Sequence, residues 1–264
     1  MKIICWNVNS IKQRISHLEQ LIKDEKPDLI LLQELKCEED KFPYLEFEGL
    51  GYNYVISGQK TFNGVAIFSK YPIEESIKTL PSYGLDDNDE QARYVEILVT
   101  AENQVWRIIS VYVPNGQEVG SDKFQYKMKY YQRLEQHLNE LQSYGENLVI
   151  AGDFNVANED IDIYDPKKLG ESICCSAFEK KALRSFMSVG LFDSFRIHKP
   201  DTANFSWWDY RGGAYDHNKG LRIDYIFANS KAMNMLRETD ILEKYRSLEK
   251  PSDHAPIMAK FKTA

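Results

Sequence analysis

Several apolar runs in the sequence end in, or lead out of, residues that could bind a metal ion or transfer a proton. The carboxylates among them are Glu34, Asp153, Asp224 and Asp253, and His254 supplies an imidazole. Because strand ends are where a rigid sheet holds functional groups, we expect these side chains to line one rim of the fold. The segments concerned are Asn7-Val8-Asn9, Gln33-Glu34, Tyr112-Val113-Pro114-Asn115, Asp153-Phe154-Asn155, Arg222-Ile223-Asp224 and Ser252-Asp253-His254.

Carboxylate and amide oxygens of this kind are suited to Mg²⁺ or Mn²⁺. The four cysteines have no C-x-x-C or Cys/His spacing, so they do not form a zinc site, and we interpret them as reduced thiols. Each candidate also has a structural interpretation. Asn and Asp commonly cap turns, Glu34 could be a solvated charge, and Tyr112 could simply pack in the core.

The elements that must position these residues are short strands and amphipathic helices. Runs rich in Val, Ile, Tyr and Phe predict strands at Lys2–Trp6, Leu29–Gln33, Tyr54–Ser57, Val65–Ser69, Tyr94–Thr100, Val105–Val113, Leu148–Gly152, Ile223–Ala228 and Pro256–Phe261. Apolar residues spaced three and four apart predict helices over Ser10–Glu25, with Ser10 as its cap, Lys123–Gln142 and Ser176–Val189. Helices spread among many strands indicate an α/β or α+β fold with helices covering sheet faces.

Length and composition set further limits. The 264 residues show no repeat or linker, which predicts one domain over residues 1–264. No apolar run exceeds four residues, so we expect no membrane span, and without a secretory leader we expect a cytoplasmic protein. The formal net charge of −7 argues mildly against a nucleic-acid partner, unless a basic face or a bound cation reverses the sign locally.

The sequence resembles the endonuclease/exonuclease/phosphatase superfamily, and within it the exonuclease III type of abasic-site DNA-repair nuclease. The most specific motif is FSWWDYRGGAYDHNKGLRIDYIF at 205–227, since GDFN and SDH also occur in superfamily members with other substrates. The other matching segments, in family order, are CWNVNSIKQR, LLQELKC, NGVAIFSK, YVPNG, IAGDFNVA and SDHAP. The resemblance implies a DNase I-like, four-layer sandwich of two mostly antiparallel sheets flanked by helices, with the active site at one end.

The resemblance also implies roles in phosphodiester hydrolysis. His254 would bind or polarise the scissile phosphate while Asp224 fixes its tautomer. Asp153 would act either as general base toward the attacking water or as proton donor to the leaving group. Tyr112 and Asn155 would donate neutral hydrogen bonds to the transition state. The expected ligands of one or two Mg²⁺ ions, with Mn²⁺ as substitute, are Asn7, Glu34, Asp153, Asn155, Asp253 and His254.

DNA contacts are expected from Asn115, Trp207, Arg222, Lys60 and His254. Trp207 would pack at an abasic pocket shaped by Phe205, Leu221 and Ile223, although it could equally belong to the core. A positive track could form from residues in or near these loops, or their charges could be evenly solvated. They are Lys36, Lys60, Lys70, Arg93, Lys123, Lys127, Lys129, Arg211, Lys219 and Arg222.

The function we expect is that of a Mg²⁺-dependent phosphodiesterase that cuts DNA 5′ to an abasic site and trims blocked 3′ ends. The substrate would be double-stranded DNA with either lesion, and the enzyme would be a monomer. Two alternatives remain: another nuclease or phosphatase of the superfamily, or a catalytically silent DNA-binding protein. The aromatic and basic segment 205–224 argues against a soluble inositol phosphate, and the complete set of candidate catalytic residues argues against a silent protein.

Overall fold

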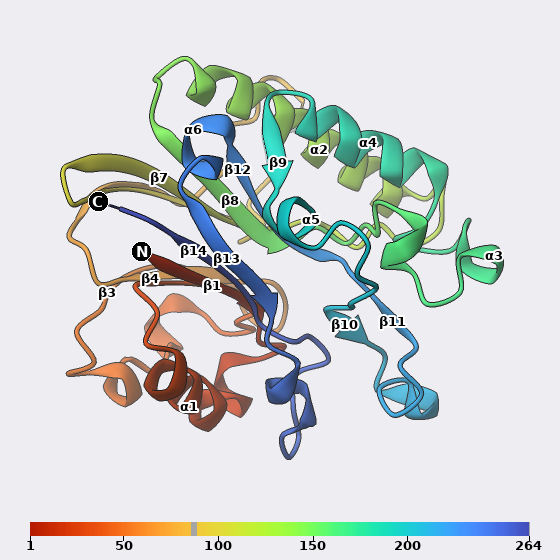
Figure 1. Ribbon diagram of the computed structural model, residues 1–264, viewed down its shortest axis with the longest axis horizontal. Helices are drawn as coiled ribbons and strands as arrows, with labels where there is room; N and C mark the ends of the chain where they lie inside the picture. The colour runs from red at the N-terminus through yellow and green to blue at the C-terminus, as the bar shows by residue number, and fades with distance from the viewer. Residues whose placement is uncertain (86–88, 264) are drawn as a thin grey trace.

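The computed structural model describes residues 1–85 and 89–263, and its centre is a pair of six-stranded sheets packed face to face (Figure 1). In spatial order, the first sheet consists of β13 (Leu236–Ile241), β14 (Ile257–Phe261), β1 (Lys2–Asn7), β2 (Leu29–Gln33), β4 (Val65–Ser69) and β3 (Asn53–Ser57). The second consists of β5 (Ile73–Ile77), β6 (Tyr94–Ala101), β7 (Gln104–Tyr112), β8 (Asn147–Asp153), β12 (Asp224–Asn229) and β9 (Leu191–Asp193). A separate two-stranded ribbon pairs β10 (Trp207–Trp208) with β11 (Gly220–Leu221).

Helices cover the outer faces of both sheets. Helix α1 (Ile15–Glu25) lies outside the first sheet, and α2 (Asp122–Gln142) and α4 (Ala177–Met187) lie together outside the second (Figure 1). The short helices are α3 (Pro166–Leu169), α5 (Ser194–His198) and α6 (Ser230–Met233). The predicted four-layer sandwich is therefore confirmed. No helix in the described ranges is long and apolar enough to span a membrane.

Each sheet contains one parallel pair of strands at its centre. Strand β1 runs parallel to β2, and β7 runs parallel to β8, whereas the remaining pairs are antiparallel. A parallel pair needs a crossover connection, and α1 and α2 supply these two crossovers. The carboxyl ends of β1 and β2 therefore meet at one edge, as do those of β7 and β8.

Alternation of side chains along the central strands builds three apolar layers. In β1, Ile3 and Cys5 face the core between the sheets, while Ile4 and Trp6 pack under α1. A third cluster fills the space between the second sheet and helices α2 and α4. Burial on both faces explains why these strands read as nearly continuous apolar runs.

The predicted strands are all present, with ends that match or differ by one residue, but five of the described strands were missed: β10 and β11 of the two-stranded ribbon, and the three strands β5, β9 and β13. Strand β5 is largely exposed and carries two glutamates, β13 has four consecutive polar residues between its apolar ends, and β9 has only three residues. All three lie at the edges of their sheets, where burial leaves little apolar pattern. The cap predicted at Ser10 is wrong: Ser10 makes no capping hydrogen bond and precedes a short 3₁₀ turn, and α1 begins at Ile15.

Candidate active site

Strand register brings the predicted residues to one end of the sandwich. Asn7, the last residue of β1, is paired with Gln33, the last residue of β2. In the second sheet, Asp153 at the end of β8 is paired with both Tyr112 and Asp224. Because the two sheets face each other, these ends lie on opposite sides of a shared opening.

Close approach of two strands fixes the backbone beside Asp153. A Cβ placed on Gly152 would lie 1.9 Å from the carbonyl oxygen of Val111 on the neighbouring strand. Only glycine fits at that position. The next residue, Asp153, therefore leaves the strand at a fixed point and carries its carboxylate into the site.

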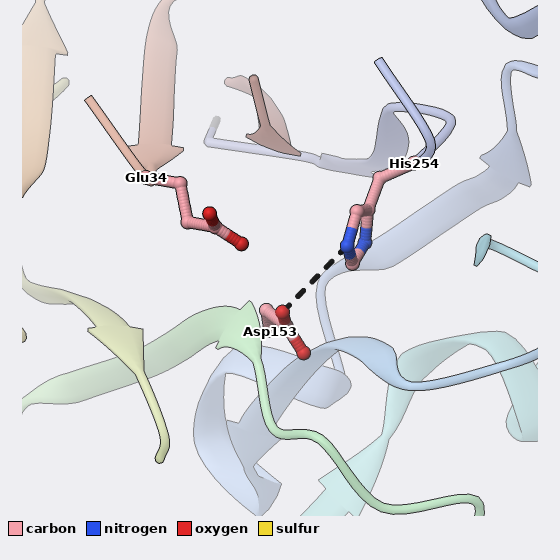
Figure 2. Close-up of side chains that lie close together, drawn as sticks. All are labelled: Glu34, Asp153 and His254. Atoms are coloured by element: carbon pink, nitrogen blue, oxygen red, sulfur yellow. Dashed lines mark ion pairs between the residues drawn. The ribbon is translucent and has the colours of Figure 1, made fainter. Parts of the chain in front are cut away.

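Glu34, Asp153 and His254 form a compact group of possible metal ligands. They come from different elements and point toward one another, as Figure 2 shows, and one ligand atom from each lies within 4.8 Å of the others. The side-chain amide of Asn7 donates to Glu34 Oε1 at 2.8 Å and to Asp153 Oδ2 at 3.0 Å. Two carboxylates so close together repel each other unless one takes up a proton or a cation lies nearby, and their oxygens fit a divalent cation.

The other three expected ligands occupy different places. Asn7 directs its amide nitrogen to the carboxylates, and its oxygen accepts from the Asn9 backbone N–H at 3.0 Å. The oxygens of Asp253 accept from Asn9 Nδ2 at 2.8 Å and from Trp207 Nε1 at 3.0 Å. Asn155 Oδ1 accepts from Asn115 Nδ2 at 3.1 Å. In this arrangement these three residues make hydrogen bonds around the group of three, and their predicted role as metal ligands stays a prediction.

Buried hydrogen bonds fix the imidazole of His254. Its Nδ1 lies 2.8 Å from Asp224 Oδ2, and the same oxygen accepts from Ser206 Oγ at 2.6 Å. Nε2 points toward Asp153, with 3.8 Å between that nitrogen and Oδ2. Burial would lower the pKa of His254, but the Asp224 carboxylate outweighs it and, with Asp153, raises the pKa above its usual value. The Asp224 carboxylate therefore favours the protonated imidazole, and Nε2 faces the opening.

The pKa values of Asp153 and Tyr112, on the other side of the opening, are also raised. Burial, with Asp224 and Glu34 nearby, raises the pKa of Asp153 against the opposing effect of His254. Burial also raises the pKa of Tyr112, as do the Glu34 and Asp153 carboxylates. Tyr112 therefore keeps its proton at neutral pH and is a neutral hydrogen-bond donor. Asp153 is the carboxylate with the strongest tendency to take up a proton.

These groups line a cavity of about 420 Å³ that opens at the end of the sandwich. Tyr112, Asn115, Asn155 and Trp207 share its wall with the ligand group. Leu221 and Ile223 supply the apolar part of the wall, as predicted, but Phe205 packs into the core between the sheets instead. Size and mixed polarity suit a sugar-phosphate unit.

The predicted DNA contact by Arg222 is wrong, and Lys127 cannot belong to a positive track on the surface. Arg222 is 1% exposed, because its guanidinium donates to Asp162 and Asp193 in the interior. Lys127 is completely buried and paired with Glu179. Lys60 is exposed in the loop between β3 and β4 and is not part of the cavity wall.

The sequence did not predict that three further residues belong to the site. Ser206 lies within the recognised segment 205–227, but its contact with Asp224 depends on tertiary structure. Arg93 was named only as a possible part of a positive track, but its guanidinium lies 4.7 Å from the ring centroid of Tyr112. Cys174 lines the cavity with a backbone φ of +67°, a conformation uncommon for a residue with a side chain.

Comparison with known proteins agrees with this fold. The model of the endonuclease/exonuclease/phosphatase family matches residues 4–254. Exodeoxyribonuclease III of Haemophilus influenzae is 36% identical over 271 residues, covering 99% of this chain and 100% of that protein. Among solved structures, the 3′ phosphatase NExo from Neisseria, bound to a product DNA hairpin, has a TM-score of 0.94 and 38% identity, covering 99% of each chain. An AP endonuclease from Archaeoglobus fulgidus has a TM-score of 0.93 and 34% identity, covering 100% of each.

The fold and the site define a hydrolase of the phosphodiesterase type, in which buried acid and base groups face a cavity able to take a sugar-phosphate unit. The chain belongs to the endonuclease/exonuclease/phosphatase family. Its resemblance to the exonuclease III type, inferred from the motifs, is confirmed by these full-length similarities.

Proposed function

We propose that this protein is a Mg²⁺-dependent DNA-repair phosphodiesterase that cuts the backbone 5′ to abasic sites and also removes blocking groups from 3′ ends. The observation that carries this proposal is the buried His254–Asp224 pair beside the Glu34 and Asp153 carboxylates in one open cavity. The full-length similarity to an exodeoxyribonuclease III and to an AP endonuclease supports the choice of DNA as substrate.

In the proposed reaction, the cationic imidazole of His254 binds a non-bridging oxygen of the scissile phosphate. Asp153, whose pKa is raised and whose carboxylate is held by a hydrogen bond from Asn7, takes a proton from the attacking water as the water oxygen bonds to phosphorus. The bond between phosphorus and the 3′-oxygen breaks, and this oxygen leaves as a 3′-hydroxyl after taking a proton from solvent. Tyr112 and Asn155 donate hydrogen bonds to the phosphate oxygens as negative charge builds on them. Donors fixed before the reaction are the ones that stabilise a transition state most.

Glu34 and Asp153 are the residues that would hold the metal ion, because the protonated imidazole of His254 has no lone pair to give it. When bound there, Mg²⁺ supplies Lewis-acid relief of the charge on the phosphate. Lys36 contacts the outer oxygen of Glu34, with 2.9 Å between Nζ and Oε2, and so orients that carboxylate toward the cavity.

Specificity would come from the cavity wall. Trp207, Leu221 and Ile223 form an apolar surface against which a sugar without its base can pack, whereas an intact nucleotide would have to place a base there. Asn115 and the exposed Arg211 lie at the same cavity and could contact flanking phosphates.

One assay tests the proposal. The purified protein is incubated with a duplex carrying a single abasic analogue and, separately, with a nicked duplex ending in a 3′-phosphate, each with Mg²⁺ or with EDTA. We expect incision 5′ to the abasic site and release of phosphate, both abolished by EDTA and restored by excess Mg²⁺. Cleavage of neither substrate would contradict the proposal. Phosphate release without incision would favour a second candidate, a 3′-end-processing enzyme, as the Neisseria relative is described.

Salt dependence provides a further prediction despite the net charge of −7. The logarithm of DNA affinity is expected to fall linearly with the logarithm of salt concentration, with a slope of about −0.9 per neutralised phosphate. Lys60→Gln should make the slope shallower by roughly one phosphate contact. Lys231→Gln, in α6 at the opposite end of β12, is the matched control and should leave the slope unchanged. A slope near zero in the unmodified protein would mean that DNA phosphates are not contacted.

A further inference from the structure

A buried ion pair lies directly behind the cavity wall. Lys127 on α2 and Glu179 on α4 contact each other, and both are 0% exposed. Removing two charges from water is costly unless each finds further polar partners. The partners found here are the loops that carry candidate active-site residues.

Lys127 uses its remaining hydrogen bonds on two of these loops. Its Nζ donates to the backbone carbonyl of Asn115 at 3.1 Å and to that of Asn155 at 2.8 Å. The same two residues also contact each other, with 3.1 Å between Asn115 Nδ2 and Asn155 Oδ1. A single ammonium group therefore sets the spacing between the loop after β7 and the loop after β8.

Glu179 fixes a third segment in the same way. Its carboxylate accepts from the backbone N–H of Cys174 at 3.2 Å and from that of Ser176 at 3.0 Å, and also from Ser176 Oγ at 2.7 Å. The Cys174 thiol lies 3.6 Å from Asn155 Oδ1, so this segment also faces the candidate site. The ion pair thus connects three separate segments of the cavity wall.

The side chain of Lys127 also shapes the first loop by packing. Gly116, next to Asn115, has a φ of +84°, and a Cβ built on it would lie 2.6 Å from Lys127 Cδ. The loop follows the aliphatic part of the lysine closely, and a side chain at position 116 would push the two apart.

We propose that Lys127, with Glu179 as its counter-ion, is a positioning residue for phosphodiester cleavage. It acts by holding the side-chain amides of Asn115 and Asn155 at the cavity, without touching the substrate itself. The inference rests on the proposed roles of these two amides. A displacement of about 1 Å at such groups is enough to slow a reaction strongly.

The test compares Lys127→Met with Arg107→Met. Arg107 is a matched control, because it is also buried and paired with two carboxylates, Glu96 and Glu146, but lies five residues before the end of β7. Both variants lose a buried cation and should unfold at a lower temperature. We expect Lys127→Met to lower kcat by roughly 10- to 100-fold at a temperature where both are folded. Arg107→Met should keep kcat near the unmodified value.

A double-mutant cycle distinguishes positioning from general weakening. If Lys127 acts largely through Asn155, Lys127→Met should reduce kcat much less in an Asn155→Ala background than on its own. Full additivity of the two losses would overturn the proposal. If Asn155→Ala alone keeps full activity, the proposed role of Asn155 fails first, so the two failures are distinguishable.

If Lys127→Met does not fold, the Gly116→Ala variant tests the same proposal. This variant leaves both charges in place but forces the loop away from the lysine. It should lower kcat in the same direction, with far-ultraviolet circular dichroism unchanged. Unchanged kcat in a folded Gly116→Ala or Lys127→Met protein would overturn the proposal.

Discussion

His254→Gln is expected to lower kcat on abasic DNA by roughly 10²- to 10⁴-fold, the range typical of a lost acid–base or charged group at a reacting centre. Glutamine still offers an amide donor toward Asp224, so the buried carboxylate keeps a hydrogen-bond partner. It cannot carry the positive charge that Asp224 and Asp153 hold on the imidazole. Single-turnover rates on the abasic duplex at saturating enzyme measure this loss.

The control for this experiment is a second buried histidine outside the site. His137 is 5% exposed and its Nε2 lies 2.8 Å from Glu96, so its burial and carboxylate pairing resemble those of His254. His137→Gln should change thermal stability by a similar amount and leave the single-turnover rate unchanged. Equal loss of activity in both variants would mean that His254 acts through folding alone, and the catalytic proposal would fail.

Glu34→Gln is expected to raise the Mg²⁺ concentration for half-maximal activity by at least roughly tenfold, since affinity for hard cations depends on the number of charged oxygen ligands. Glutamine has the same size as glutamate and can still contact Asn7 and Lys36. The substitution removes one negative charge from the ligand group. Titration of activity with Mg²⁺ gives the midpoint. Electron paramagnetic resonance of free Mn²⁺ gives the affinity without activity.

Asp209→Asn provides the comparison within the same cavity. The Asp209 carboxylate also lines the cavity, but its oxygens accept from Arg211, and it lies outside the group of three ligands. Its Mg²⁺ midpoint should stay at the unmodified value. A midpoint unchanged in Glu34→Gln as well would remove Glu34 from the metal site.

Much of the site could be predicted because its residues stand at the ends of strongly apolar strands. Asn7, Glu34 and Asp153 each follow such a run, and the runs are recognisable because both faces of the central strands are buried. The edge strands β5 and β13 could not be found in this way, since one face or more of each is solvated and the apolar alternation is weak.

The exposure of basic residues was predicted least well from the sequence. Lys127 and Arg222 look like surface cations in the sequence, because lysine and arginine are usually exposed. Both are buried, since carboxylates distant along the chain reach them: Glu179 in one case, Asp162 and Asp193 in the other. Nothing local to either residue indicates a partner 29 to 60 positions away.

The sequence by itself determined the layered fold, the family and the types of group available for chemistry, because strand periodicity and short motifs are local properties of the chain. Only the tertiary structure decided which of those groups meet. Glu34, Asp153 and His254 are separated by at least 100 residues. Parallel pairing of β1 with β2 and of β7 with β8 brings Glu34 and Asp153 to one rim, and antiparallel pairing of β14 with β1 brings His254, just before β14, to the same rim. No local pattern in the sequence shows that Nδ1 of His254 contacts Asp224, which leaves Nε2 facing the opening. The same is true of the hydrogen bonds from Lys127 to the loops that carry Asn115 and Asn155.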